Sequence, residues 1–368
     1  MKAYGTDPVT LRVNGLEYAG VGGQRWNSVT ITESLESLAR DFTVGVVGVF
    51  ASEPEAIEAG DSVEVWVGRD KLLTGWVDDH EVGGDARTES VTANGRSLTG
   101  DLVDCSASPG TWSGLTVAKL VQALTEPYRI ELVDQAGVGS QVVSRWRTED
   151  GEVIFDGLDR LGRSVGALVT DDGAGRLVLT TTGTARCTDA IERGRPGFIS
   201  GSVKRSQSER YSKYSCRGQV FTDLEVDPHA VGYAEDTGIT RYRELIIRPE
   251  RGMTKAEAAA RARWEASTRA AKSLVVTVTV RGWRQSDGSL WRANMLVTYT
   301  DKLARIDRAE LLIVDVIRTL DANGRVTTMR LMPEEAFRLP PGEAVTVAAG
   351  TSSSSKGPSK RPHKKAPR

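Results

Sequence analysis

The sequence predicts a mainly β protein with α+β insertions, and three observations support this fold class. Short stretches in which apolar and polar residues alternate recur in both halves of the chain, and turn residues separate them. Glycine is abundant, at 38 of 368 residues, and hydrophobic residues make up only 39%, as expected of a turn-rich protein with several modest cores. A chain of this length is also too long for one compact core, so we expect two to four domains.

The first domain, residues 1–104, is predicted to consist of strands joined by turns. Residues 9–18 alternate in polarity and contain Asn14-Gly15, a dipeptide typical of tight β-hairpins. Residues 28–47 predict two strands around an irregular connection, and residues 61–82 predict two strands around a turn at residues 68–70. Strands at this regular spacing indicate a barrel or a sandwich.

Two small α+β domains are predicted next, at residues 105–145 and 146–195. The apolar residues between positions 115 and 124 have helical spacing, and Pro127 ends this helix before a strand begins. A second helix is expected from about Val153 to Leu161, followed by a strand, an Asp-Gly turn and another strand.

Strands resume in the second strand-rich domain, residues 196–340, which is interrupted by one helix. Thr254 and Glu257 have the spacing of a capping box, in which the two residues exchange hydrogen bonds at a helix N-terminus. The residues that follow are rich in alanine, the strongest helix former. Asn323-Gly324 predicts a closing hairpin, so the second half of the chain resembles the first in its order of elements.

A hairpin with two tryptophans is predicted within residues 273–301. Trp283 lies before the turn, Asp287 and Gly288 supply the turn itself, and Trp291 begins the return strand ahead of Asn294. Cross-strand aromatic residues near a turn stabilise a hairpin, so we favour a structural role. The two tryptophans lie near mirror positions about the turn, so a shared, exposed face that binds a sugar is the alternative.

The charge of the chain is unevenly distributed. Net charge is −1, but residues 351–368 contain six Lys/Arg and no acidic residue, which leaves 42 basic against 49 acidic side chains, or −7, for residues 1–350. Phosphate binding requires clustered basic side chains, so an acidic body argues against specific nucleic-acid binding. Residues 341–368 are predicted to form a disordered basic tail, because they cannot bury apolar area.

No targeting, membrane or disulfide pattern is found. The N-terminus lacks the apolar run of a signal peptide, and no stretch approaches 18 consecutive apolar residues, so we expect synthesis in a cytoplasm and no membrane insertion. The three cysteines, Cys105, Cys187 and Cys216, are far apart, which indicates neither a disulfide framework nor a zinc site.

The sequence predicts no catalytic, metal-binding or cofactor-binding residues. Residues 162–166 match G-x-S-x-G, but a nucleophile elbow needs a strand before the serine and a helix after it, and the order here is reversed, so Ser164 is expected in a turn. The histidines, His80, His229 and His363, lack metal-ligand spacing. No phosphate-binding loop occurs, and no pair among the 49 acidic residues stands out as a glycosidase pair.

Residues 237–301 contain three elements in a fixed order: the "RYRELII" strand, the Ala/Arg-rich helix and the "GW…DG.LW..N.LV" hairpin. In these elements the segment resembles the corresponding region of contractile-tail baseplate hub proteins, the family of the phage Mu hub and late control protein D. The N-terminal half is similar more loosely, through "LLTGWVDD" and "NGRSLTGDLVDCSA".

The resemblance implies a structural protein of the virion and no enzymatic activity. It implies a homotrimer at the centre of the baseplate, in which each chain contributes two β-barrel domains and smaller α+β domains. Six barrels in a ring would then match the hexameric tail tube on one side and receive the trimeric central spike on the other. Tail tube, spike and baseplate wedge proteins are the expected partners. The alternative is a glycan-binding or cell-wall-hydrolysing tail protein that uses Trp283 and Trp291.

Overall fold

The computed structural model describes residues 7–18, 26–46, 57–84, 89–218, 220–221, 226–227, 230–249 and 252–341. Within these ranges the protein is mainly β with a few helices, which confirms the fold class predicted from the sequence. The predicted tail at 341–368 lies, apart from its first residue, outside the described residues, as do His229 and His363.

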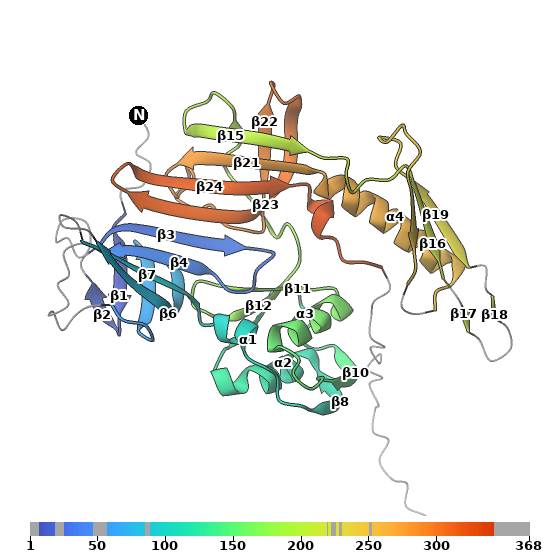
Figure 1. Cartoon of the computed structure of the whole chain (residues 1–368), viewed down its shortest axis with the longest axis horizontal. Helices are drawn as coiled ribbons and strands as arrows, with labels where there is room; N and C mark the ends of the chain where they lie inside the picture. The colour runs from blue at the N-terminus through green and yellow to red at the C-terminus, as the bar shows by residue number, and fades with distance from the viewer. Residues whose placement is uncertain are drawn as a thin grey trace, which may run out of the picture.

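Strand module 1 is formed by seven antiparallel strands in the order β3-β4-β7-β6-β5-β1-β2 (Figure 1). They are β1 (Val9–Val13), β2 (Leu16–Tyr18), β3 (Trp26–Ser34), β4 (Asp41–Val46), β5 (Ser62–Val67), β6 (Asp70–Gly84) and β7 (Glu89–Ser97). Asn14 and Gly15 both have positive φ, at 50° and 80°, as the hairpin turn between β1 and β2 requires. The alternating apolar residues fill the module's core, which confirms the predicted hairpin and strand pattern.

An insertion unit covers residues 98–180 and has one hydrophobic core. Its elements are α1 (Gly100–Asp104), β8 (Thr111–Thr116), α2 (Val117–Thr125), a 3₁₀ turn (Glu126–Tyr128), β9 (Leu132–Asp134), β10 (Val142–Arg147), α3 (Ile154–Val165), β11 (Leu168–Asp171) and β12 (Leu177–Thr180). β9 pairs parallel with β12, so the two α+β segments predicted at 105–145 and 146–195 share a sheet as well as a core. Helices α1 and α3 differ from the prediction, because α1 was not expected and α3 extends to Val165.

Strand module 2 has its own apolar core and lies next to module 1 (Figure 1). It contains β13 (Ala185–Arg186), β14 (Ile191–Glu192), β15 (Phe198–Arg205), β21 (Leu274–Arg281), β22 (Met295–Asp301), β23 (Ile306–Asp321), β24 (Gly324–Met332) and a 3₁₀ turn (Glu334–Phe337).

An outlying unit is inserted between β15 and β21 and lies at one side of the molecule (Figure 1). It consists of β16 (Lys213–Arg217), β17 (Val220–Phe221), β18 (Val226–Asp227), β19 (Val231–Glu235), β20 (Glu244–Ile247) and α4 (Lys255–Lys272). The alanine face of α4 packs against Tyr214 and Cys216 of a three-stranded sheet, so this helix has a core separate from that of module 2. The sequence had placed the helix within a single domain at 196–340.

The two strand modules form one continuous 14-stranded sheet, because β3 of module 1 pairs antiparallel with β23 of module 2.

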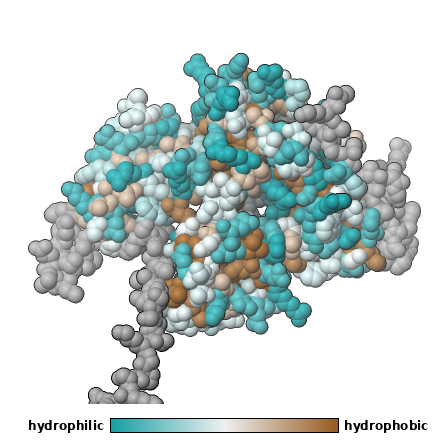
Figure 2. All heavy atoms as spheres, turned by 180° about the vertical axis from the view of Figure 1, so that it is seen from behind, coloured by the Kyte–Doolittle hydropathy of each residue, from teal (hydrophilic) through white to brown (hydrophobic). Residues whose placement is uncertain are grey.

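The face of the molecule opposite to that in Figure 1 is largely hydrophilic, and its hydrophobic side chains gather at the lower centre of the view (Figure 2). That position is where Figure 1 places the insertion unit.

The two modules repeat one order of five strands. In module 1 the order is β3-β4-β7-β6-β5, and in module 2 it is β15-β21-β24-β23-β22. We number the five strands of each module one to five in chain order. The spatial order of the strands is then one-two-five-four-three in both modules, and all neighbouring strands pair antiparallel. A similar order of elements was expected from the sequence; the structure gives it a strand-by-strand correspondence.

The irregularities of the sheet repeat as well. The pairing of strands two and five has no register shift in either module. The other three pairings each have one, at corresponding positions: Trp26/Ser28 and Phe198/Ser200 between strands one and two, Val65/Trp66 and Tyr299/Asp301 between strands three and four, and Val77/Asp79 and Ile313/Asp315 between strands four and five. A bulge bends a strand at a defined place, so shared bulges indicate that the two modules have the same curvature.

Candidate functional site at the junction of the strand modules

Strand β23 changes its neighbour halfway along its length. Its first half, 306–312, pairs with β22, and its second half, 315–320, pairs with β3. At the change, the carbonyl of Ile313 accepts a hydrogen bond from the Asn294 N–H at 2.9 Å, and the carbonyl of Val314 accepts one from the Leu35 N–H at 3.0 Å. The junction between the modules is therefore held by a nearly continuous set of backbone hydrogen bonds.

A buried ion network lies beside this junction. It consists of Glu33 on β3, Arg40 in the β3–β4 connection, Arg318 on β23 and Asp171 at the end of β11, all less than one-tenth exposed. The Glu33 carboxylate lies 3.0 Å from Arg40 Nη1 and 3.2 Å from Arg318 Nη1, and it accepts a hydrogen bond from the Ala293 N–H at 2.5 Å. Arg40 Nε donates to Asp171 Oδ1 at 2.8 Å.

The two carboxylates of the network have opposite pKa shifts. Burial by itself raises the pKa of Glu33, but Arg318 and Arg40 outweigh burial and lower the pKa to about 2. Burial raises the pKa of Asp171, and its contact with Arg40 offsets this only in part. Glu33 is therefore the firmly ionised centre of the network, with a guanidinium on either side.

The network joins three parts of the chain. Glu33 and Arg40 belong to module 1, Arg318 belongs to module 2, and Asp171 belongs to the insertion unit. Arg40 also donates to the carbonyls of Leu72 and Asp171, at 3.0 and 3.2 Å. Breaking a buried ion pair costs several kcal/mol, so these contacts fix how the three parts are oriented.

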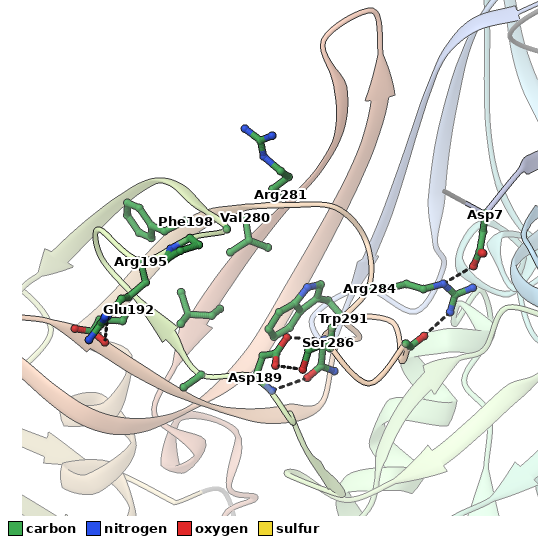
Figure 3. A pocket seen from close by; sticks show the side chains of 16 residues that line it. Asp7, Asp189, Glu192, Arg195, Phe198, Val280, Arg281, Arg284, Ser286 and Trp291 are labelled. Atoms are coloured by element: carbon green, nitrogen blue, oxygen red, sulfur yellow. Dashed lines mark hydrogen bonds and ion pairs between the residues drawn. The ribbon is translucent and has the colours of Figure 1, made fainter. Parts of the chain in front are cut away.

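Arg284 forms a second connection between the modules, from the loop that joins β21 to β22. Its Nε and Nη1 atoms each lie 2.7 Å from a carboxylate, of Asp7 and Asp70 respectively, and its Nη2 donates to the Val67 carbonyl at 2.9 Å. The loop also closes on itself, because Nη1 donates to the Gly288 carbonyl at 2.8 Å. Figure 3 shows the arginine extended toward Asp7.

A hollow of about 720 Å³ lies beside this loop (Figure 3). Arg195 and Arg281 line it together with acidic residues. One of these, Asp189, accepts hydrogen bonds from the Ser286 N–H, at 2.7 Å, and from the Ser286 hydroxyl. This carboxylate is therefore engaged in holding the loop, as Asp7 is engaged by Arg284 and Glu192 by Arg195.

The two tryptophans of the predicted hairpin are buried in different cores. Trp283 is 3% exposed in the core of module 1, and its Nε1 atom donates to the carbonyls of Thr319 and Val326 at 3.1 and 3.0 Å. Trp291 is 4% exposed in the core of module 2, and its carbonyl accepts a hydrogen bond from Arg318. The two indoles therefore do not form the shared, exposed face that a sugar platform needs.

The hairpin itself is shorter than the sequence suggested. Arg284 and Leu290 form an isolated bridge, and the Trp291 N–H donates to the Trp283 carbonyl at 3.1 Å. The flanking strands, however, do not pair with each other, since β21 lies between β15 and β24 and β22 pairs with β23, β13 and β14. The prediction of a return strand starting at Trp291 is therefore wrong: β22 starts at Met295.

The remaining residues of this segment have local roles. The Asp287 carboxylate accepts hydrogen bonds from the N–H and hydroxyl of Ser289, at 2.8 and 2.7 Å, and Gly288 has a φ of 86°. Asn294, just before β22, also has a positive φ, of 66°. Its side-chain amide binds the segment that follows the insertion unit, because it donates to the Thr181 carbonyl at 2.7 Å and accepts from the Gly183 N–H at 2.9 Å.

The helix cap lies away from the junction, at the start of α4. The Thr254 hydroxyl accepts a hydrogen bond from the Glu257 N–H at 3.3 Å, and the Glu257 carboxylate accepts one from the Thr254 N–H at 2.8 Å. The backbone N–H groups of Thr254 and Glu257, which have no partner within the helix, are thereby satisfied.

Ser164 and Cys187, two residues whose side chains could act as nucleophiles, both lie in structural surroundings. Ser164 lies in the last turn of α3 and not in a turn after it, and its hydroxyl donates to the Leu161 carbonyl at 2.7 Å. Burial raises the pKa of Cys187 to about 12, which leaves its thiol protonated. Among the described residues, no group of three or more His, Cys, Asp or Glu is arranged to hold a metal ion, and no helix combines the length and apolar character needed to cross a bilayer.

Sequence reasoning missed the ion network, although one signal was present. Glu33 follows Val29 and Ile31 in the alternation of β3, and Arg318 follows Val316 in the alternation of β23, so each charge occupies a position in phase with the core. A charge at such a position needs a partner, but the sequence does not say which one.

Comparisons with known proteins define the class of the protein as a phage tail component. The structure is similar to the 43 kDa tail protein of prophage MuSo2 from Shewanella oneidensis, with a TM-score of 0.79 and 28% identity over 90% of this chain and 99% of that one. It has the fold of a tail protein from Neisseria meningitidis MC58, with a TM-score of 0.73 and 21% identity over 88% and 95% of the two chains.

The sequence matches show the family. Residues 8–97 match a model described as Mu phage baseplate assembly protein GpP-like, N-terminal; residues 99–181 match baseplate hub protein gp44-like, second domain; and residues 254–340 match Mu phage baseplate assembly protein GpP, fourth domain. The chain is 30% identical over 350 residues to baseplate hub protein gp44 of Escherichia phage Mu, covering 91% of this chain and 90% of that protein. The chain belongs to this family of Mu-like baseplate hub proteins and is a structural component of the virion tail.

Proposed function

We propose that three copies of this chain form a ring at the centre of the baseplate, between the hexameric tail tube and the trimeric spike. One observation carries the proposal: the two strand modules have the same five-strand order and the same three register shifts. Three chains with two equivalent modules each would present six similar units, which suits a sixfold tube, while the trimer keeps a true threefold axis for the spike.

In this proposal the protein acts by assembly and not by catalysis. The strand modules, assigned from the sequence to residues 1–104 and 196–340, are the two barrel domains of the proposed ring. The ion network and Arg284 support the proposal, because a symmetry adaptor requires two modules held at one fixed angle. Synthesis in the host cytoplasm, contacts with wedge proteins and the absence of enzymatic activity are further parts of the same proposal.

The native mass of the purified protein tests the ring. We expect a species of about 119 kDa, three times the chain mass of 39.8 kDa, in mass photometry or light scattering over a range of concentrations. If only the 39.8 kDa monomer forms, the measurement is repeated with the spike protein from the same virion. A monomer in the presence of the spike contradicts the proposal.

A further inference from the structure

A hollow of about 450 Å³ lies at the neck of the outlying unit, where α4 leads into β21 (Figure 1). One wall is formed by the C-terminal half of α4 together with Val275 of β21, and the other by the segment from Lys204 to Glu209, which leaves β15. The two chain crossings of the neck are joined by a hydrogen bond from the Ser206 N–H to the Ser273 carbonyl, at 2.9 Å. A group that fills this neck hollow therefore contacts the outlying unit and module 2 together.

The surface of the neck hollow combines open apolar side chains with polar groups that lack partners. Trp264 and Val275 are only half-buried. Thr268 is 5% exposed, yet its hydroxyl has no hydrogen-bond partner among the described residues. Lys204 and Lys272 are exposed, and within the described ranges their ammonium groups form no hydrogen bond or ion pair. Because a buried hydroxyl without a partner costs free energy, this surface suits a chain segment that covers the apolar groups and supplies a carbonyl oxygen.

The chain itself brings a segment to this place. The 3₁₀ turn at Glu334–Phe337 contacts α4, and the Trp264 Nε1 atom donates to the Arg338 carbonyl at 2.7 Å. The described part of the chain ends shortly afterwards, at Pro341. Pro341-Gly342 is a dipeptide that favours a turn. A reversal there directs the following residues back along α4, past Trp264 and toward the neck hollow.

The residues after this turn have the composition that the neck hollow requires. Residues 343–348, with the sequence EAVTVA, alternate in polarity, so Val345 and Val347 lie on one face of an extended segment. Glu343 is their only charged residue, and its sign is opposite to that of the two lysines of the hollow. The basic residues of the predicted tail begin further on, at Lys356. Residues 343–348 therefore differ from the rest of the tail, because they can bury two valines.

The lengths of the segment and of the neck hollow agree. The hollow extends along α4 from Trp264 to Lys272, which corresponds to about 12 Å at the rise of an α-helix. Residues 343–348 span about 20 Å when extended, which is enough to cover it. A short tether keeps the segment at an effective concentration in the roughly millimolar range, so a few contacts suffice to hold it.

We propose that residues 343–348 dock in the neck hollow of their own chain, with Val345 and Val347 against its apolar wall. The Thr268 hydroxyl then donates to a backbone carbonyl of the docked segment, and the two lysines of the hollow lie around a segment of negative charge. The docked segment touches both walls of the hollow, so it fixes the angle of the outlying unit against module 2. This inference concerns a single chain and does not depend on the ring.

Hydrogen exchange in the full-length chain, followed by mass spectrometry, tests the docking. The backbone amides of residues 344–348 should exchange at least about tenfold more slowly than those of residues 352–357. Val345→Asp and Val347→Asp should each remove most of this protection, because a carboxylate would then face the apolar wall. Thr346→Asp is the matched control: it adds the same charge on the other face of the segment, and protection should stay within about threefold of wild type.

A change in the neck hollow provides the second test. Thr268→Val keeps the shape of the side chain and removes only a hydroxyl that has no partner among the described residues. It should lower the protection of residues 344–348 by at least about threefold, because a carbonyl of the docked segment loses its donor. The thiol reactivity of Cys216, which is buried under α4, should not change and thereby shows that the outlying unit stays folded.

A charge reversal provides the third test. Replacing both lysines of the hollow, Lys204→Glu with Lys272→Glu, should lower the protection by about threefold or more, since the segment then meets charges of its own sign. Adding Glu343→Lys to this variant should return the protection to within about threefold of wild type. Rescue of this kind is not expected if the segment lies away from the two lysines.

Three results would overturn the inference. Equal exchange of residues 344–348 and 352–357 shows that the segment is not held. Protection that is unchanged in the Thr268 and lysine variants shows that the segment is held elsewhere. Protection that falls when the protein is diluted shows that the segment comes from another copy of the chain. None of these results bears on the trimeric adaptor, which the native mass tests separately.

Discussion

At the scale of single residues, Glu33 holds the junction together by an unusual balance of charge. One buried carboxylate faces two buried guanidinium groups, and Asp171 balances the second of them from the other side. Burying these charged groups costs the free energy of removing them from water, a cost that hydrophobic residues of similar volume would avoid. The network therefore contributes more to selecting one arrangement of the three parts of the chain than to the stability of the fold. The proposed ring requires the two modules at one fixed angle, and this specificity is the property of the network that would serve it.

Replacing Glu33 with Gln should destabilise the protein and change its response to acid. The folded pKa of about 2 lies below the ordinary 4.5, so the ionised form stabilises the fold above pH 4.5 and this contribution is lost as pH falls toward 2. We expect a loss of about 3–5 kcal/mol in the free energy of unfolding at pH 7, because Arg318 and Arg40 lose their shared carboxylate.

Urea unfolding between pH 7 and pH 2 measures both effects. The decline in stability from pH 4.5 to 2 should be shallower in the variant by up to roughly 3 kcal/mol, the equivalent of the pKa shift. The raised pKa of Asp171 acts in the opposite direction, favouring the fold as pH falls, and it remains in both proteins. Glu58→Gln, at an exposed position, is the control and should leave both quantities nearly unchanged. Equal slopes in the Glu33 variant and wild type would argue against the ionised network.

At the scale of elements, α4 shows how composition determines packing distance. Three of its buried residues, Ala258, Ala262 and Ala266, pack against the sheet and allow the helix backbone to approach it closely. Gly232 on β19 is the point of closest approach: a Cβ there would lie 2.0 Å from the backbone nitrogen of Ala259. Neither backbone can move without displacing a whole element, so this glycine is required by space and not by its φ angle.

Gly232→Ala should separate the helix from the sheet and destabilise the outlying unit by about 1–3 kcal/mol. Cys216 reports on this directly, because its thiol is fully buried under α4 and should react faster with a thiol reagent in the variant. Gly157→Ala in α3 is the matched control, since its added Cβ would meet nothing closer than 3.7 Å. A Cys216 reactivity equal to that of wild type would show that the unit absorbs the methyl group without opening.

The elements also show what the sequence could and could not predict. Alternation predicted β1 to β6, the change of period predicted α2 and α3, and the start of α4 was evident from Thr254 and Glu257. Strand partners were not predictable in the same way: residues 273–301 were interpreted as one hairpin, yet β21 and β22 belong to different parts of the sheet. Pairing depends on residues far away in sequence, as for Glu33 and Arg318, which are 285 positions apart.

At the scale of the whole molecule, specific contacts join the cores of module 1, module 2 and the insertion unit. The β3–β23 pair connects the strand modules, and Arg40 connects module 1 to the insertion unit. The turn between β11 and β12 also packs on β6, since the Thr74 hydroxyl donates to the Gly173 carbonyl at 3.1 Å. The insertion unit should therefore unfold together with module 1 as long as these contacts are intact.

Arg40→Met should uncouple the insertion unit from the strand modules. The substitution leaves the buried Asp171 without its guanidinium, at a cost of about 3–5 kcal/mol, and removes two hydrogen bonds to backbone carbonyls. In differential scanning calorimetry we expect the insertion unit to melt separately and at lower temperature than the rest. Arg176→Met, which breaks an exposed pair with Asp172 in the same hairpin, should change stability by less than about 1 kcal/mol. A single, merely shifted transition in the Arg40 variant would contradict the coupling.

The two copies of the repeat differ most in the connection between their first and second strands. Between β3 and β4 it comprises residues 35–40, whereas between β15 and β21 it comprises residues 206–273 and includes the whole outlying unit. In a ring of three chains the six walls would be nearly alike, but only every second wall would carry this appendage. The ring would then present six similar binding positions where the strand modules form its surface. It would present only three where the outlying units form its surface. The length of one connection, and not any change in the strands, would decide which symmetry each face presents.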